Sequence, residues 1–165
     1  MNIFKLDDCP KKSAELQHDK HVVKMILESA QMLCSVYHAQ EIDGVPYRKT
    51  HHNHPCSVWA REDMDNFYWL IDHAFALCKE YTHRYGRVHK SQAVIEWCRK
   101  NASKLNIPMV GITPFAQAMP NEYRQPNSIK AYRNYYVNEK LNRKTKWTNR
   151  NIPNIFINKM ELINK

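Results

Sequence analysis

Apolar residues recur every three or four positions through the first half of the chain, and this spacing constrains the fold more than any other feature of the sequence. Such a period places the apolar side chains on one face of an α-helix. It predicts one long helix over about residues 10–43 and a second over about 57–85. The apolar stripe of the first comprises Leu16, Val23, Leu27, Ala30, Cys34 and Tyr37, and that of the second Phe67, Leu70, Ala74, Leu77 and Tyr81.

The rest of the chain predicts shorter helices and loops. Helices are expected over about 91–105 and 129–141, and the four prolines within 106–127 indicate an ordered but irregular excursion between them. No alternating strand pattern is present. We therefore expect an all-α fold, a compact single-domain helical bundle with long irregular loops. Residues 1–147 would form the domain, and 148–165 a basic and apolar C-terminal extension.

Glycine and cysteine usage exclude several classes of protein. Three glycines are too few for a glycine-rich phosphate loop, which argues against a Rossmann or P-loop domain. The five cysteines include no CxxC pair, so neither a zinc ribbon nor a thioredoxin motif is supported. Reduced, mostly buried thiols are expected in a cytoplasmic protein. No secretion signal or membrane-spanning run is apparent, so no membrane partner is expected.

The net charge of +9 is large for 165 residues and predicts a polyanionic partner, most often nucleic acid. Residues 128–165 alone carry +7 and residues 1–127 only +2. This concentration favours a binding surface over a charge that merely keeps the protein soluble. Cations interleaved with Tyr and Trp suit contacts to phosphates and bases. The predicted nucleic-acid-binding residues are Lys20, Arg61, Arg84, Arg87, Lys90, Arg133, Lys140, Arg143, Lys144 and Lys146.

Four polar residues of the first helix, His21, Lys24, Glu28 and Gln31, are spaced by three, four and three positions and so share one face. An exposed Lys–Glu pair at this spacing is commonly a weak surface contact, worth roughly 0.3–0.5 kcal/mol. Apolar residues flank the stripe closely, however, and burial would perturb the pKa values of its members. We therefore interpret His21, Lys24 and Glu28 as candidate catalytic residues.

A second candidate group is the proline-bounded loop Thr50-His51-His52-Asn53-His54-Pro55. Its histidines suit acid–base work or hydrogen bonds to phosphate, and His51 and His54 are predicted to be catalytic. A metal site is a less favoured alternative, because no metal-ligand pattern of known geometry is complete, and no metal or cofactor is predicted. The loop could also serve simply as a turn that caps the next helix.

These features together resemble the phage pyrimidine-dimer DNA glycosylase family of the endonuclease V type, across most of residues 1–147. The spacing of His21 and Glu28 matches a His and a catalytic Glu of that family. Asn53-His54-Pro55 precedes a helix that ends in Arg84-Tyr85-Gly86, and Tyr132–Tyr136 compares with the aromatic, lysine-rich end of the family. The chain also resembles a group of uncharacterised tailed-phage proteins.

The resemblance implies an all-helical glycosylase/lyase that acts on DNA. In that mechanism an N-terminal amine attacks C1′ of the damaged nucleotide, a Glu stabilises the cationic transition state, and a base is flipped from the duplex. Here Asn2 follows Met1 where the family exposes a small residue, so the nucleophile would be the Met1 amine, Lys20 or Lys24. Leu27 and Ser29 stand beside Glu28, where the family has arginines.

The leading hypothesis is therefore a phage-type, DNA-acting enzyme of DNA repair, a base-excision glycosylase or glycosylase/lyase, or else a nuclease. It would act as a monomer on double-stranded DNA in the host cytoplasm. Glu28 would be acid, base or charge stabiliser, and Lys24 a phosphate ligand or nucleophile. A non-catalytic nucleic-acid-binding or host-takeover protein, and an enzyme that acts on free nucleotides, are the alternatives.

Overall fold

The computed structural model describes residues 1–165, which form seven α-helices and three short 3-10 helices without any strand. This confirms the predicted all-α fold. The α-helices are α1 (Pro10–Leu16), α2 (Asp19–Ala39), α3 (Pro55–Ala60), α4 (Met64–Tyr85), α5 (Gln92–Lys100), α6 (Ser128–Glu139) and α7 (Ile157–Asn164). The 3-10 helices are η1 (Ala102–Lys104), η2 (Asn121–Tyr123) and η3 (Asn154–Phe156). No helix is both long and apolar enough to span a bilayer.

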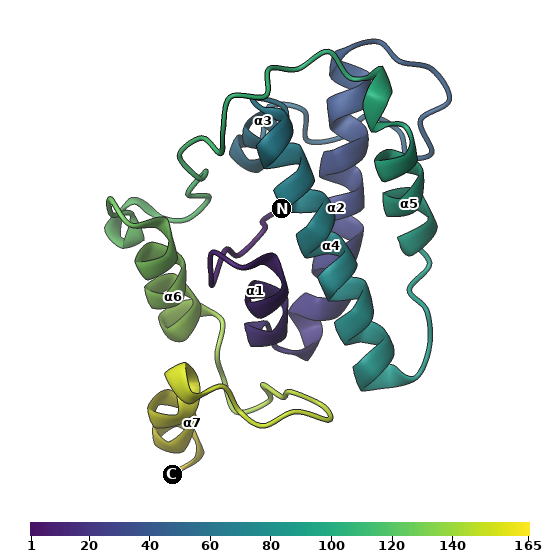
Figure 1. The fold of residues 1–165 in the computed structure, drawn as a ribbon. Helices are drawn as coiled ribbons and strands as arrows, with labels where there is room; N and C mark the ends of the chain where they lie inside the picture. The colour runs from purple at the N-terminus through teal and green to yellow at the C-terminus, as the bar shows by residue number, and fades with distance from the viewer.

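The two longest helices, α2 and α4, pack against each other and form the centre of the domain (Figure 1). Helices α3 and α5 lie against both of them, and α1 packs on α4. The predicted apolar stripe of α4 is buried along its whole length, from Phe67 at 0 % exposure to Tyr81 at 9 %. Gly86 ends α4 in the left-handed conformation, with φ of 66°, as its position in the sequence predicts.

Both predicted long helices are interrupted near their N-terminal ends, contrary to the prediction. The first breaks at Gln17 and His18, whose ψ angles of 138° and 166° are extended. The amide of Gln17 turns inward and donates to the Ile3 carbonyl over 3.0 Å. The second breaks before α4, where the Asp63 carboxylate accepts from the Asp65 N–H over 2.8 Å and so starts a new helix. Local competition of the Asp63 side chain for a backbone N–H explains the second break, and the inward-turned Gln17 amide accompanies the first.

The apolar stripe predicted for the first helix is partly wrong. Val23 and Leu27 are 39 % and 41 % exposed, whereas Val22 and Ile26 are fully buried. Apolar residues cover more than half of the circumference of α2, so periodicity alone does not identify the face that meets the core. The exposed Val23 and Leu27 instead lie beside Lys24, at the edge of the predicted polar stripe.

The first six residues form an extended segment that is buried in the core beside the middle of α2 (Figure 1). Ile3 and Leu6 are fully buried, and the Ser13 hydroxyl both accepts from the Leu6 N–H and donates to the Phe4 carbonyl. Phe4 has a φ of 54°, an unfavourable value for a bulky side chain. These contacts fix the position of the chain's first amine.

The C-terminal part packs on the opposite side of the N-terminal segment from α5, with α6 and α7 at the edge of the domain (Figure 1). Tyr132 and Tyr136 of α6 and Phe156 of η3 are fully buried, and Met160 of α7 is 3 % exposed. The segment after residue 147 therefore contacts the helical body. The helix α7 was not expected from the sequence, and the boundary at 147 stays a prediction.

Candidate active site

Glu28 lies at the centre of the candidate site, buried in the middle of α2 with 8 % of its surface exposed. The backbone N–H of Asn2 donates to its Oε2 over 2.8 Å, and the amine nitrogen of Met1 lies 3.9 Å from the same oxygen. The ammonium of Lys24 approaches Oε1 at 3.4 Å. Glu28 thus receives two cations and one amide, and it joins the beginning of the chain to α2.

The Met1 amine is held in place by its own side chain and by Asn2. The Met1 side chain is only 1 % exposed, and the Ser57 hydroxyl donates to its sulfur over 3.7 Å. The Asn2 amide donates to the Ala118 carbonyl over 2.7 Å, and its oxygen accepts from the N–H of Ile3. These contacts hold the amine on both sides and keep it within ion-pair distance of Glu28.

His54 completes the group, as the loop that contains it brings α3 to the same place. It is the N-cap of α3, where its Nδ1 accepts from the Cys56 N–H over 3.2 Å. Burial and the nearby Met1 ammonium both lower the pKa of His54, whereas the Glu28 carboxylate raises it. Met1, Lys24, Glu28 and His54 therefore converge, as the interpretation of the two polar groups requires.

His21 shares the face of Glu28 but is committed to packing contacts. Its ring stacks on Phe4 at 4.4 Å between centroids, and its Nδ1 lies 2.9 Å from the Tyr136 hydroxyl. Burial, reinforced by His18 and nearby lysines, lowers the pKa of His21 to about 2. The ring is therefore neutral at physiological pH, and it is better placed to support the site than to protonate a leaving group.

His51 is exposed, with φ of 47°, and its Nδ1 lies 2.7 Å from the Thr50 hydroxyl. Beside it a hollow of 310 Å³ joins α2 to the histidine loop; it is lined by Leu27, Gln31, Tyr47, Arg48 and Thr50. A volume of this order is at the lower end for small-molecule pockets. It offers apolar, amide and cationic groups, and its lining residues Leu27 and Gln31 lie on either side of Glu28 along α2.

Three of the predicted nucleic-acid-binding arginines are at least partly buried and make contacts within the protein. Arg84 is 3 % exposed and is bound to Glu80 and Asp19, which makes it a structural residue and not the predicted phosphate clamp. Arg133 donates to the Leu6 carbonyl over 2.7 Å and pairs with Asp7. Arg61 donates to the His52 carbonyl and so braces the histidine loop. A side chain's partners across the fold are not visible in its sequence neighbourhood.

The predicted cations outside this set are more accessible. Lys20, Lys140, Lys144 and Lys146 gather around the N-terminal end of α2, where Lys20 and Lys140 lower the pKa of His18. Arg87 lies over the Tyr81 ring at 5.9 Å, and Arg143 donates to the Ile163 carbonyl. Lys90 is exposed after α4. Their contact with nucleic acid stays a prediction.

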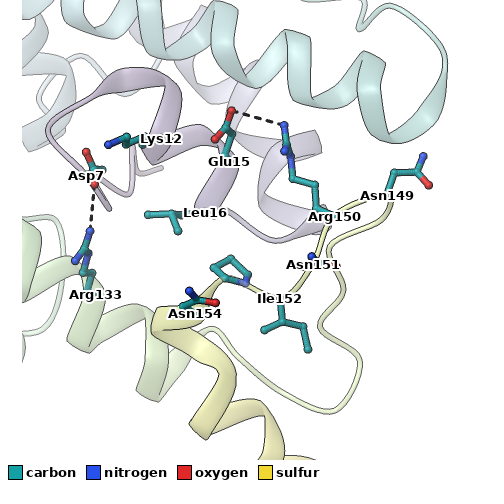
Figure 2. A pocket seen from close by; sticks show the side chains of 11 residues that line it. Asp7, Lys12, Glu15, Leu16, Arg133, Asn149, Arg150, Asn151, Ile152 and Asn154 are labelled. Carbon is teal, nitrogen blue, oxygen red and sulfur yellow. Dashed lines mark hydrogen bonds and ion pairs between the residues drawn. The ribbon is translucent and has the colours of Figure 1, made fainter.

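The largest hollow of the surface, 850 Å³, is separate from Glu28 and lies between α1, α6 and the C-terminal segment (Figure 2). Figure 2 shows ion pairs at two of its edges, Asp7 with Arg133 and Glu15 with Arg150. Acidic and basic groups alternate around it, and none of the predicted catalytic residues lines it. Size alone therefore does not identify the reactive site.

No group of three or more His, Cys, Asp and Glu side chains is placed to hold a metal ion. The site instead consists of an amine, a carboxylate, an ammonium and an imidazole. The roles of Asn2, Ser57 and Tyr136 were missed in the sequence. Asn2 contacts a residue 26 positions away, Ser57 one 56 positions away and Tyr136 one 115 positions away, so no local spacing could have revealed these contacts.

The fold and the site together define an all-helical domain that buries a carboxylate beside two amines. The sequence model of one family, described as pyrimidine dimer DNA glycosylase, matches residues 1–93 of the 165. The chain belongs to this family and is a DNA glycosylase. The match includes Met1, Lys24, Glu28 and His54 and ends before α6. No curated protein and no solved structure matches the chain.

Proposed function

We propose that the protein excises a base from DNA that contains pyrimidine dimers and then cleaves the strand by a lyase step. The family description supplies the lesion. The single observation that carries the mechanism is the placement of the Met1 nitrogen 3.9 Å from buried Glu28. An amine next to a carboxylate can lose its proton and attack, and apo distances of this kind shorten in the substrate complex.

The chemistry would proceed at C1′ of the damaged nucleotide. The amine nitrogen bonds to C1′ while the glycosidic bond breaks, and the electron pair of that bond passes to the base, which takes up a proton and stays joined to its partner pyrimidine through the cyclobutane ring. Glu28 accepts the amine proton and stabilises the positive charge that develops on the sugar. Opening of the sugar ring then gives a Schiff base, from which β-elimination breaks the strand.

The neighbouring groups have separate roles in this proposal. Lys24 is 67 % exposed on its side chain and can hold a phosphate beside the reacting sugar while it pairs with Glu28. His54, with its lowered pKa, is a neutral acceptor or donor next to the amine. The 310 Å³ hollow of Leu27, Gln31, Tyr47, Arg48 and Thr50 is a suitable place for an extruded base.

Reduction with borohydride tests the covalent step. On a duplex with one cyclobutane pyrimidine dimer, the protein should form an adduct that borohydride converts to a stable amine bond. Peptide mapping should place the sugar remnant on the Met1 amine, or on the Asn2 amine if Met1 is removed, because the Asn2 nitrogen is 2.8 Å from Glu28. Cleavage of the glycosidic bond without any adduct, seen as a strand break that appears only after hot alkali, would exclude the lyase route. An adduct on Lys20 or Lys24 would exclude the terminal amine.

A further inference from the structure

A small pocket at the N-terminal end of α2 has features that the base-excision chemistry does not use. It has a volume of 80 Å³ and is lined by His18, Asp19, Lys20, Asn142, Lys144, Thr145 and Lys146. This volume is two to three times the roughly 30 Å³ that one water molecule occupies in the liquid. It is therefore too small for a nucleobase but has room for a small ion, and none of the lining residues is apolar.

The charges around the pocket favour an anion. Lys20, Lys144 and Lys146 are exposed, and none of them forms an ion pair within the protein. The one acidic lining residue is already neutralised by other groups. Asp19 pairs with Arg84 at 3.1 Å and accepts from the Thr148 N–H and hydroxyl. The pocket thus has an excess of positive charge.

The backbone adds a second source of positive potential. The pocket lies at the first turn of α2, a helix of 21 residues, where the helix dipole attracts anions. No side chain caps this end, and the Asp19 N–H donates to the Lys146 carbonyl over 2.9 Å. This bond holds the loop of Lys144 and Lys146 against the helix, so the lysines and the helix end form one unit.

His18 supplies an independent indication of a ligand. It is 5 % exposed, it lines the pocket, and its Nε2 is buried without any hydrogen-bond partner. An unsatisfied buried nitrogen of this kind costs free energy, and such groups in native proteins are normally paired. The ring is held between His21, at 4.1 Å between centroids, and Trp147. Burial lowers the pKa of His18 to about 4, so the neutral ring can donate from Nε2 to an anion.

We propose that this pocket binds one phosphate group of the DNA backbone and so sets the register of the duplex on α2. His18, His21, Lys24 and Glu28 are spaced by three, three and four positions and therefore follow one face of the helix. Glu28 is nine residues beyond Asp19, about 14 Å at 1.5 Å per residue. With 3.4 Å per nucleotide of each strand, the bound phosphate lies roughly four nucleotides from the attacked sugar. The inference rests on the proposed function only in taking DNA as the partner.

Replacement of single phosphates by neutral methylphosphonates tests the assignment. Binding to a duplex with one cyclobutane pyrimidine dimer, which fixes the register, is measured in the Glu28→Gln background with and without the double change Lys20→Ala/Lys144→Ala, and one phosphate is neutralised at a time. A methylphosphonate at one position should lower the DNA affinity of the protein with both lysines and leave that of the double variant unchanged. The slope of log K against log salt should fall by about 0.9 for the double variant, the value for one phosphate. Because both lysines share one phosphate, the two single variants should not be additive.

A matched control is Lys104→Ala, an exposed lysine in η1 at the other end of the domain, which should change neither slope nor position dependence. Titration with inorganic phosphate should shift the NMR resonance of the backbone amide of residue 20 in the wild type and not in the double variant. If that shift occurs but every methylphosphonate position affects both proteins equally, the pocket serves a free anion and the DNA assignment is wrong. If inorganic phosphate causes no shift and no single methylphosphonate position distinguishes the two proteins, there is no anion site. Binding is measured without turnover, so loss of base excision does not affect the result.

Discussion

The backbone N–H of Asn2 donates to Oε2 of Glu28 over 2.8 Å, and this bond joins the beginning of the chain to the middle of its central helix. It places the Met1 nitrogen 3.9 Å from the same oxygen. A buried carboxylate normally needs partners to remain charged, and Glu28 has them in the amide, the amine and Lys24. The same groups that satisfy the carboxylate are those that the proposed reaction uses.

We expect Glu28→Gln to abolish base excision and to spare DNA binding. The amide keeps the size of the side chain but can neither accept the amine proton nor stabilise positive charge. The loss should be at least about 100-fold in the single-turnover rate, the lower range for proton-transfer catalysis. Glu161→Gln, at an exposed position of α7, is the control and should retain full activity. Activity of Glu28→Gln within tenfold of the wild type would remove Glu28 from the mechanism.

Replacement of Lys24 by alanine separates the two amines near Glu28. If the terminal amine is the nucleophile, Lys24→Ala keeps the borohydride adduct and lowers the rate by no more than about tenfold, or 1.4 kcal/mol in the barrier. The reason is that the exposed Lys24 contributes only a phosphate contact and one ion pair. Gel electrophoresis of the reduced complex measures the adduct. Its complete loss in this variant, with DNA binding intact, would make Lys24 the nucleophile.

Removal of the charge of Glu80 should destabilise the fold more than any surface change. Glu80 is 4 % exposed and pairs with both Arg84 and Arg150, and Arg84 is itself buried. Glu80→Gln leaves Arg84 with less compensation, and broken buried pairs cost about 3–5 kcal/mol. Urea denaturation should show this loss, whereas exposed Glu122→Gln should stay within about 0.5 kcal/mol of the wild type. Equal stabilities of the two variants would contradict a structural role for the Glu80 network.

The free energy of unfolding should fall on acidification from about pH 6.5 to pH 4. Burial lowers the pKa of His18 and of His73 to about 4 each. Below the ordinary value of 6.5 the unfolded chain therefore binds protons that the folded chain does not, so stability is complete above pH 6.5 and declines below it. Each unit of difference corresponds to about 1.4 kcal/mol per group. Urea denaturation at pH 7, 5.5 and 4.5 measures the decline, and His73→Gln should make it shallower.

The helices could be predicted from the sequence because their signals are local. The buried stripe from Phe67 to Tyr81 and the stop at Gly86 depend only on spacing and on one backbone conformation. The breaks before α2 and α4 were missed, since Gln17 binds the Ile3 carbonyl and Asp63 the Val110 N–H, partners that only the folded chain brings together. Pattern therefore determines the element, and tertiary contacts determine its ends.

The candidate site was only partly accessible from the sequence. Lys24 and Glu28 share a helix face by spacing alone, and the structure places His54 of the next loop beside them. The buried positions of Arg84 and His21, in contrast, follow from partners distant in sequence, such as Asp19 for Arg84 and Tyr136 for His21. Charge and residue type were visible in the sequence, but exposure was not.

The burial of residues 1–6 has a practical consequence for handling the protein. Any residue attached ahead of Met1 would have to share the space between α2 and α3 that the 1 % exposed methionine side chain already fills. A purification handle there would acylate the amine and displace it from Glu28, so a well-folded preparation could be inert. A handle fused after exposed Lys165 leaves that space untouched, so a comparison of the two preparations shows whether the Met1 nitrogen, which we propose as the nucleophile, must be free.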